Sequence, residues 1–534
     1  MNAPSTALFA RRKSDRIELP PMSDALATSV AIDHANKIFY IDKSKQTNPL
    51  MLSWLRNADH LCQFSNVFTI KAVPITEIAA LHEKGDYLLS SAKEPKHDDM
   101  HVQQQALDLI AQAANIGASD LHILVNPTFT EVQVRSKGEL RVMSLKYSRS
   151  EGHAIIRAMC QGLATVKNNT HNPKEFQDAQ LSGKDITNLG LTSVRLVRGP
   201  CHPVDDDAEF AVLRLQYQPS HKVQKGLALN VPRRPDGQLN LAKRGYSDKQ
   251  IEMLKMLACS PNGIIIFSGP TGSGKTTSLY EMLSYNARER PESRLITIED
   301  PVEYPMPWAV QLVISNAANE SETGKAFAER LRVSLRMDPD TLLLGELRGV
   351  DSAEAAINAA LTGHQVWTTI HTNDAFQIVD RLEFMDSTRL ARKIFCDHKT
   401  IRGLVAQRII PTLCQKCCEP LAKHHDKLPA GQLDALKTYG DLSNVKVRGQ
   451  GCPDCDNSGI TGRMAIAEVV VTDHQLMKDF VVEGTVVARA NHRKKPGSDN
   501  SLMTNAILRC LEGKVDPRDV ASCVDIITPK GEDN

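Results

Sequence analysis

The sequence predicts an α/β fold in which the second half of the chain forms a parallel sheet with helices on both faces. From Tyr246 onward, short apolar segments alternate with longer segments of helical periodicity. Strands that are apolar throughout are typical of parallel sheets buried on both faces. The most apolar segment, Ile264–Phe267, is directly followed by a glycine-rich loop and then by a helix. This order places the loop at the edge of the sheet where ligands bind.

Strands and helices are expected to alternate along this sheet domain. The expected strands are Gly263–Ser268, Arg294–Glu299, Thr341–Gly345 and Gln365–Ile370, and the expected helices are Lys275–Tyr285, Lys325–Met337, Asp351–Leu361 and Ala375–Met385.

Length and local composition predict several domains, because 534 residues suffice for three or four domains of about 150 residues each. We expect a flexible tail, a small α/β N-terminal domain, an α+β domain, a hinge linker, the sheet domain and a C-terminal region. Their boundaries are 1–25, 26–92, 100–218, 219–244, 245–400 and 401–534. In the C-terminal region we expect helix from Ile401 and then turns around paired cysteines.

Composition argues against several classes of protein. Lys and Arg number 64 and Asp and Glu 63, so the formal net charge of +1 does not favour a nucleic-acid coat, and aromatic residues for base stacking make up only 5%. No apolar run approaches the roughly 20 residues of a membrane span, and the N-terminus lacks the apolar core of a signal peptide. Twelve cysteines are too few for a disulfide scaffold of this length. We therefore expect a cytosolic protein without a direct nucleic-acid partner.

The glycine-rich loop matches GxxxxGK[ST] in full. Its residues are Gly269, Pro270, Thr271, Gly272, Ser273, Gly274, Lys275 and Thr276, followed by Thr277. Glycines let the backbone wrap closely around phosphates, and the following helix adds its positive N-terminal end. Lys275 is expected to reach the β- and γ-phosphates, and the hydroxyl of Thr276 to hold Mg²⁺.

Polar groups follow successive strands at the same edge of the sheet. Glu299 ends the second expected strand, Glu346 follows the third and His371 follows the fourth, whereas His364 precedes the fourth strand. Taken singly, such a glutamate is more often a solvated turn or a helix cap, and such a histidine a structural residue. Their convergence beside a phosphate-binding loop favours a site that holds Mg²⁺ and orients water for hydrolysis.

Two CxxC pairs, Cys414/Cys417 and Cys452/Cys455, lie in the C-terminal region. Four thiolates suit tetrahedral Zn²⁺ with no open position, so such a site is structural. Redox-active or inert thiols are the alternative, and Cys418 is a possible competitor for one position.

At these residues the chain resembles the secretion ATPases that assemble type IV pili and drive type II secretion. The resemblance runs from about Ala118 to the C-terminus and rests on five motifs. They are GPTGSGKTTSLY, ITIEDPVEY, LRMDPDTLLLGELR, TGHQVWTTIHTNDA and, after Gln407-Arg408 and the cysteines, GITGRMAIAE. The family implies a RecA-like P-loop NTPase motor domain, a smaller PAS-like α+β domain and a zinc-binding C-terminal region.

The resemblance also implies roles and partners. Glu299 would polarise the attacking water, Glu346 would support Mg²⁺ and the water, and His371 would sense the γ-phosphate of ATP. Arg195 and Arg214 in the PAS-like domain would offset transition-state charge, although a solvated surface role is the alternative for both. Members are cytoplasmic homo-hexamers at the inner face of the inner membrane. They reach the membrane only through partners, an inner-membrane platform protein and the pilin assembly machinery, and the N-terminal domain is the candidate for docking.

Some residues depart from the family pattern, and other functions stay open. Lys137-Gly138 replaces the usual Asp-Gly, Gln133 stands where Arg is common, and Gly349 replaces an Asp. The tetracysteine module is typical of assembly motors and not of retraction motors. A RecA-like nucleic-acid motor and a nucleotide-gated scaffold are the alternative functions. The system that the chain serves is open among a conjugative thin pilus, a bundle-type pilus and type II secretion, and the divergent residues with the short N-terminal domain favour a type IVb-like pilus.

Overall fold

The computed structural model describes residues 26–531 except 27–28, 34–35, 47, 63, 83–98, 146, 168–171, 224–227, 315–319, 425 and 427. The tail expected at 1–25 therefore lies outside the described residues. The chain divides into two compact units, Met1–Gln133 with Met143–Ala228 and Val134–Val142 with Leu229–Asn534.

A small α/β layer forms the N-terminal part of the first unit. Its strands are β1 (Val30–Asp33), β2 (Ile38–Asp42) and β3 (Thr69–Val73), and its helices are α2 (Pro49–Cys62), α3 (Phe64–Val67) and α4 (Ile75–His82). The strand order is β1-β2-β3, with β1 antiparallel and β3 parallel to β2. Phe39 stacks on Trp54 at a centroid distance of 5.2 Å, and Phe64 meets both rings edge-on. This aromatic cluster joins α2 and α3 to the sheet.

A larger, mainly antiparallel sheet follows, with the strand order β12-β6-β5-β4-β11-β10-β9-β8 and β7 paired to β5. Its strands are β4 (Asp120–Val125), β5 (Phe129–Ser136), β6 (Glu139–Met143), β7 (Tyr147–Ser148), β8 (Ala164–Lys167), β9 (Gln177–Leu181), β10 (Leu191–Pro200), β11 (Glu209–Tyr217) and β12 (Leu229–Asn230). Helices α5 (Asp99–Asn115) and α6 (Arg149–Ala158) both contact β4. Ser148 and Glu151 form a capping box that fixes the start of α6.

The second unit is built on a seven-stranded sheet of order β15-β14-β16-β17-β13-β18-β21. Its strands are β13 (Gly263–Ser268), β14 (Leu295–Glu299), β15 (Ala309–Val313), β16 (Thr341–Leu344), β17 (Gln365–Ile370), β18 (Ile401–Leu413) and β21 (Ile460–Val471). All neighbours are parallel except β18 and β21, which are antiparallel. The α/β prediction and its four strands are confirmed.

The prediction of a helix from Ile401 is wrong, because this segment is the strand β18. Its pairing with β13 on one side and β21 on the other satisfies the backbone groups along a mostly buried segment. The predicted boundary between residues 400 and 401 therefore falls inside one sheet.

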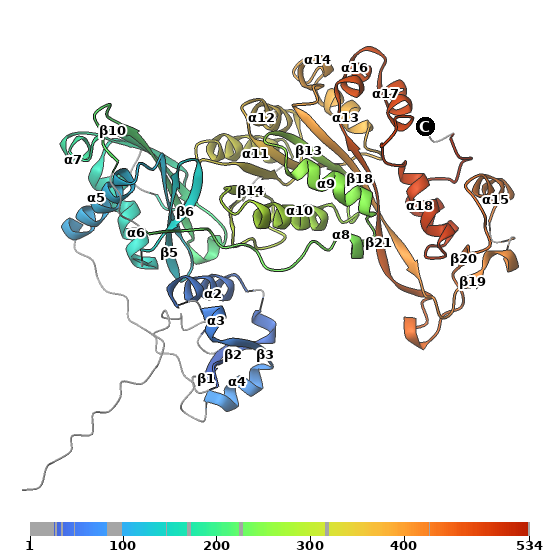
Figure 1. Ribbon diagram of the computed structural model, residues 1–534, viewed down its shortest axis with the longest axis horizontal. Helices are drawn as coiled ribbons and strands as arrows, with labels where there is room; N and C mark the ends of the chain where they lie inside the picture. The colour runs from blue at the N-terminus through green and yellow to red at the C-terminus, as the bar shows by residue number, and fades with distance from the viewer. Residues whose placement is uncertain are drawn as a thin grey trace, which may run out of the picture. The chain divides into compact units, whose positions relative to one another are not determined.

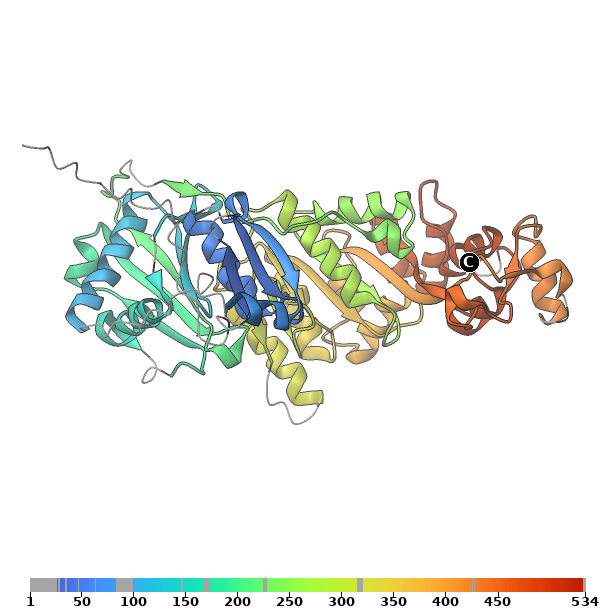
Figure 2. The ribbon, with the colours of Figure 1, turned by 90° about the horizontal axis from the view of Figure 1, so that it is seen from below.

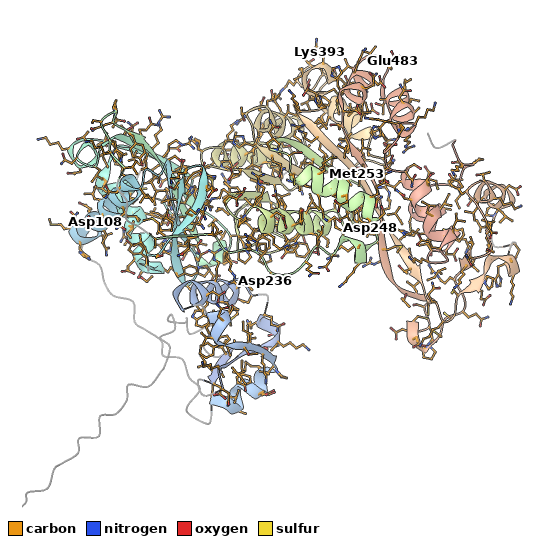
Figure 3. All side chains as sticks on the ribbon, viewed as in Figure 1. Asp108, Asp236, Asp248, Met253, Lys393 and Glu483 are labelled. Atoms are coloured by element: carbon orange, nitrogen blue, oxygen red, sulfur yellow. The ribbon has the colours of Figure 1, made fainter. Side chains whose placement is uncertain are left out.

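Helices cover both faces of this sheet (Figure 1, Figure 2). They are α9 (Asp248–Ala258) and α10 (Lys275–Glu289) on one face, and α11 (Glu320–Ser334) and α12 (Val350–Leu361) on the other. Leu254 and Leu283 of the first pair pack in one core with Phe267 and Trp367 of the sheet. The capping box of Ser247 and Gln250 starts α9, and Asp248 follows in the first turn (Figure 3). A negative charge there complements the helix dipole.

Short helices and a two-stranded ribbon complete the second unit. They are α8 (Leu241–Arg244), α13 (Gln377–Met385), α14 (Arg392–Phe395), α15 (Ala430–Lys437), α16 (His474–Val482), α17 (Thr485–Arg493), α18 (Leu502–Leu511), α19 (Pro517–Cys523), β19 (Glu419–Pro420) and β20 (Lys446–Val447). In the part of the chain that the structure describes, every helix is too short or too polar to span a bilayer.

Candidate active site

The glycine-rich loop connects β13 to α10 and has the backbone of a phosphate cradle. Gly269, Gly272 and Gly274 have φ of 146°, 78° and 81°, conformations that side chains disfavour. A Cβ on Gly269 would also lie 2.3 Å from the carbonyl oxygen of Gln407 on β18. Only glycine fits this position. The loop is therefore shaped by β18, which lies beyond residue 400, the predicted end of the sheet domain.

Lys275 and Ser273 fit a phosphate ligand. The Lys275 ammonium is buried and donates to the carbonyl oxygens of Gly269 at 2.8 Å and Pro270 at 3.1 Å. Burial lowers the pKa of Lys275, while the nearby carboxylate of Glu346 opposes that shift. The Ser273 hydroxyl is buried and has no hydrogen-bond partner among the described residues. An anion between these groups would pair the ammonium and accept from the hydroxyl.

His371 contacts the glycine-rich loop and joins it to Glu346, at the sheet edge where the sequence predicts both residues. One ring nitrogen of His371 (Nδ1) lies 3.1 Å from the Gly269 carbonyl oxygen, and the other (Nε2) lies 2.9 Å from Oε1 of Glu346. The ends of β13, β16 and β17 are therefore linked by direct polar contacts.

Arg348 extends this network to the segment of residues 300–306 after β14, called here the acidic segment because it contains Asp300 and Glu303. It donates from Nε to Oε2 of Glu346 at 3.1 Å and from Nη1 to Oδ2 of Asp300 at 3.2 Å. Arg348 is not among the predicted site residues, although it stands two residues after Glu346 in the same motif. Its position between two carboxylates is set by the adjacency of β14 and β16.

Glu299 is buried at the end of β14, beside this network. Its Oε1 accepts from Thr297 Oγ1 at 2.5 Å and from Gln311 Nε2 at 3.0 Å. Burial raises the pKa of Glu299, and the two hydrogen bonds act against that shift. In the described residues no hydrogen bond or ion pair joins Glu299 to Glu346 or His371. Its link to them runs through the neighbouring Asp300.

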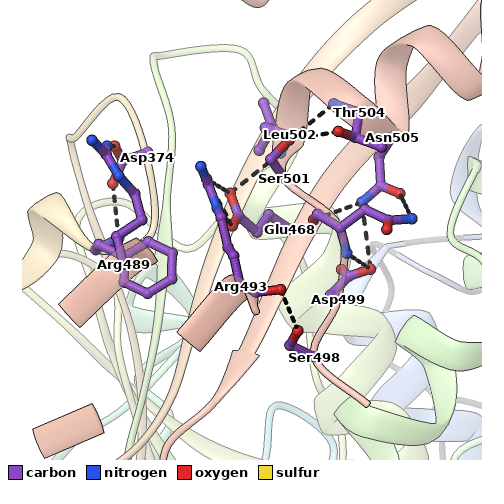
Figure 4. Close-up of polar contacts among 12 residues, drawn as sticks. Asp374, Glu468, Arg489, Arg493, Ser498, Asp499, Ser501, Leu502, Thr504 and Asn505 are labelled. Atoms are coloured by element: carbon purple, nitrogen blue, oxygen red, sulfur yellow. Dashed lines mark hydrogen bonds and ion pairs between the residues drawn. The ribbon is translucent and has the colours of Figure 1, made fainter. Parts of the chain in front are cut away.

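The loop after β17 is held from two sides by arginines. Arg408, buried on β18, donates to the Asn373 carbonyl oxygen at 2.7 Å. Arg489 of α17 donates to Oδ2 of Asp374 at 2.9 Å (Figure 4). The other carboxylate oxygen of Asp374 accepts from the backbone amides of Phe376 and Gln377, each at 2.8 Å, at the start of α13. The segment that carries His371 is therefore tied to β18 and to α17.

The remaining loop residues lie at the start of α10. Thr276 is exposed, as a residue that binds a metal ion together with solvent would be. The Thr277 hydroxyl lies 3.2 Å from the Tyr304 hydroxyl in the segment after β14. Tyr304 in turn packs on Tyr280, with ring centroids 5.0 Å apart. These contacts connect the helix of the phosphate loop to the acidic segment.

Arg195 and Arg214 lie in the first unit, whereas the other predicted catalytic residues lie in the second. They are directly opposite each other on β10 and β11, and both are exposed. Arg214 also donates from Nε to Oδ1 of the buried Asp120 at 2.8 Å. Like charges directly opposite on a sheet are destabilising, and the ion pair with Asp120 offsets part of the charge of Arg214.

The four predicted cysteines form one cluster, with all Sγ atoms within 4.8 Å of one another. The Sγ atoms of Cys414 and Cys452 are 3.7 Å apart, and those of Cys417 and Cys455 are 3.8 Å apart. A tetrahedral zinc site with Zn–S bonds of about 2.3 Å has S···S edges of about 3.8 Å. The donor set therefore fits Zn²⁺, and the neighbouring Cys418 is outside the cluster.

Comparisons with known proteins show which family the chain belongs to. The family model described as type II/IV secretion system protein matches residues 203–522. Type II secretion system protein E of Aeromonas hydrophila is 32% identical over 76% of this chain and 74% of its own length. The type IV pilus assembly ATPase PilB of Thermus thermophilus is 28% identical over 78% of this chain and 42% of its own length. A crystal structure of the pilus retraction motor PilT with ADP covers 80% of this chain and 98% of its own, at 19% identity and a TM-score of 0.39. On the family model and the relatives' sequences, the chain belongs to the type II/IV secretion system protein family.

Proposed function

We propose that this chain is a magnesium-dependent ATPase whose hydrolysis of ATP powers assembly of a type IV pilus or of a type II secretion pseudopilus. The observation that carries the proposal is a pair of contacts: His371 contacts the phosphate loop with one ring nitrogen and Glu346 with the other. It brings a phosphate cradle, an imidazole and a carboxylate into one site. Family membership supports the same activity, since relatives are named secretion proteins and pilus assembly ATPases.

The residues of the site divide the work of hydrolysis. Lys275 turns from the loop carbonyls to the β- and γ-phosphates, and His371 contacts the γ-phosphate from the adjacent strand end. Glu299 accepts a proton from the attacking water, and Glu346 orients that water. Thr276 and Glu346 are the residues that would hold Mg²⁺, which when bound neutralises phosphate charge. Arg195 and Arg214 offset the charge that develops on the transferred phosphoryl group.

The assembly and its partners follow from the family resemblance. We infer a homo-hexamer that works at the cytoplasmic face of the inner membrane on a platform protein and the pilin assembly machinery. The tetracysteine cluster holds a structural Zn²⁺, as the separations of its Sγ atoms support.

Lys275→Ala tests the activity. We expect at least a hundredfold loss of magnesium-dependent phosphate release, because the variant lacks the ammonium that pairs with the phosphates. Lys255→Ala is the matched control, since Lys255 is a surface lysine of α9 that pairs with Glu252, and its turnover should equal that of wild type. Undiminished hydrolysis in Lys275→Ala would refute the site. Tight ATP binding by the wild type without phosphate release would indicate a nucleotide-gated scaffold, and stimulation by DNA a nucleic-acid motor.

A further inference from the structure

Gln311 of β15 is a buried amide whose hydrogen bonds converge on Glu299 and on the acidic segment that follows it. Its Nε2 donates to Oε1 of Glu299 at 3.0 Å and to the carbonyl oxygen of Tyr304 at 3.0 Å. Its Oε1 accepts from the backbone amide of Met306 at 2.7 Å. We propose that Gln311 is a positioning residue that fixes the orientation of the Glu299 carboxylate for hydrolysis.

The direction of the amide follows from its partners. The Met306 N–H can only donate, so it requires the amide oxygen, whereas the Tyr304 carbonyl and the Glu299 carboxylate can only accept, so they require the NH₂ group. A rotated amide would break all three hydrogen bonds at a site where Gln311 is only 4% exposed. The NH₂ group is therefore held against Glu299, because only this orientation of the amide makes all three hydrogen bonds.

Two donors restrain the same carboxylate oxygen, one from β14 itself and one from its neighbour β15. Thr297 reaches Oε1 of Glu299 from two residues earlier on β14, and Gln311 reaches it from the parallel neighbour β15. Rotation of the carboxylate would cost both hydrogen bonds, so its plane is fixed. Burial is the main effect that disfavours the ionised form of Glu299, and the charge of the Glu303 carboxylate adds to it. The donors Thr297 and Gln311 on Oε1, together with the backbone amide of Glu303, act against both effects and favour the ionised form that a base requires.

This inference rests on the proposed role of Glu299 as the base, and Gln311→Met tests it. Methionine keeps the length of the side chain and removes both polar ends. We expect kcat for ATP hydrolysis to fall about tenfold to a hundredfold with little change in KM, since misplacement of a reacting group has costs of this size. We also expect the acid limb of the kcat profile to move to higher pH, because one donor to the ionised carboxylate is lost.

Gln365→Met is the matched control. Gln365 is also a buried glutamine of this sheet, but it lies at the opposite end of β17 and donates to the carbonyl oxygens of Ala258 at 3.0 Å and Ser260 at 2.7 Å. Its replacement should lower the melting temperature and leave the acid limb in place. A limb that moves equally in both variants would show a general effect of lost packing and would overturn the inference.

Two further variants separate the possible failures. Glu299→Gln that hydrolyses ATP like the wild type would refute the role of Glu299 itself. If Glu299→Gln is inactive while Gln311→Met keeps the kcat and the acid limb of the wild type, the role of Gln311 alone would be overturned. Gln311→Glu retains the shape and the acceptor for Met306, so it guards against misfolding of the methionine variant. Its added carboxylate should move the acid limb further in the same direction, and an unmoved limb would count against the inference.

Discussion

Burial lowers the pKa of Lys275 and raises that of Glu299, so it favours the neutral form of each group. Lys275 compensates by donating to two loop carbonyls, and Glu299 compensates by accepting from Thr297 and Gln311. The difference is functional. A phosphate can replace the carbonyls around Lys275 with a stronger, charge-assisted partner, whereas the donors around Glu299 belong to the sheet and stay in place. The site thus combines a cation that changes partner with a carboxylate that does not.

The surroundings of Glu299 predict opposite effects of two substitutions on the pH dependence of kcat. Its pKa lies above the ordinary value of 4.5, so a base that must be ionised loses activity as the pH falls through a value higher than that. Thr297→Val removes a donor and should move the acid limb to higher pH. Glu303→Gln removes the carboxylate that repels the ionised form and should move the limb to lower pH. Steady-state kcat at saturating ATP, measured from pH 5 to 8 as roughly the physiological window, checks both signs. Shifts in the same direction would contradict this account of Glu299.

Sequence spacing predicts the candidate-site residues that belong to contiguous motifs, but it does not predict those whose partners are set by the sheet. The phosphate loop, Glu346, His371 and the four cysteines each follow a strand or share a fixed offset. Gln311 stands in an apolar strand 12 residues after Glu299. Only the pairing of β14 with β15 brings its side chain to Glu299. Arg489 is 115 residues from Asp374. Neither separation carries a signal without the strand order.

At the scale of elements, β18 shows why the helix predicted from Ile401 was wrong. Its apolar residues occur in pairs and threes around Gly403, Gln407 and Arg408, a pattern that suits a buried strand or a buried helix equally. Pairing with β13 decides between them, and that pairing also brings the Gln407 carbonyl against Gly269. The element that was hardest to predict therefore supports the loop that was easiest to predict.

The contact of α17 with the loop after β17 predicts the effect of Arg489→Ala. Removing the guanidinium leaves the partly buried Asp374 carboxylate with only its two backbone donors, so we expect the free energy of unfolding to fall by about 1–2 kcal/mol. Turnover should fall as well, because the segment that carries His371 loses one of its two arginine contacts. Urea unfolding and steady-state ATPase assays measure the two effects.

Arg389→Ala is the control for this prediction. Arg389 also pairs with carboxylates, those of Asp351 and Glu354, but its side chain is 43% exposed. Exposed pairs contribute little to stability, so the loss should be smaller and turnover unchanged. If Arg389→Ala destabilised the protein as much as Arg489→Ala, the contact with Asp374 would have no special importance.

At the scale of the whole molecule, the cysteine cluster closes the far end of the longest strand pair. Cys414 directly follows β18, and Cys452 and Cys455 precede β21. The segment between them, with β19, β20 and α15, leaves and rejoins the sheet at this one point. The Cys414 amide also donates to the Gly459 carbonyl oxygen at 3.0 Å. A metal ion here would hold both ends of the insertion at the end of the β18–β21 hairpin.

The proposed zinc site predicts different outcomes for two adjacent cysteines. Cys417→Ser removes one of four thiolates, so we expect loss of the zinc and a lower melting temperature, because metal binding to the folded chain contributes to its stability. Cys418→Ser changes the next residue, which lies outside the cluster, and it should retain one zinc per chain. Elemental analysis of the purified variants and thermal melts before and after chelation provide the measurements. Chelation should lower the melting temperature of the wild type and of Cys418→Ser but not that of Cys417→Ser. Zinc retained by both variants, or lost from both, would refute the assignment of these four thiolates as the ligands.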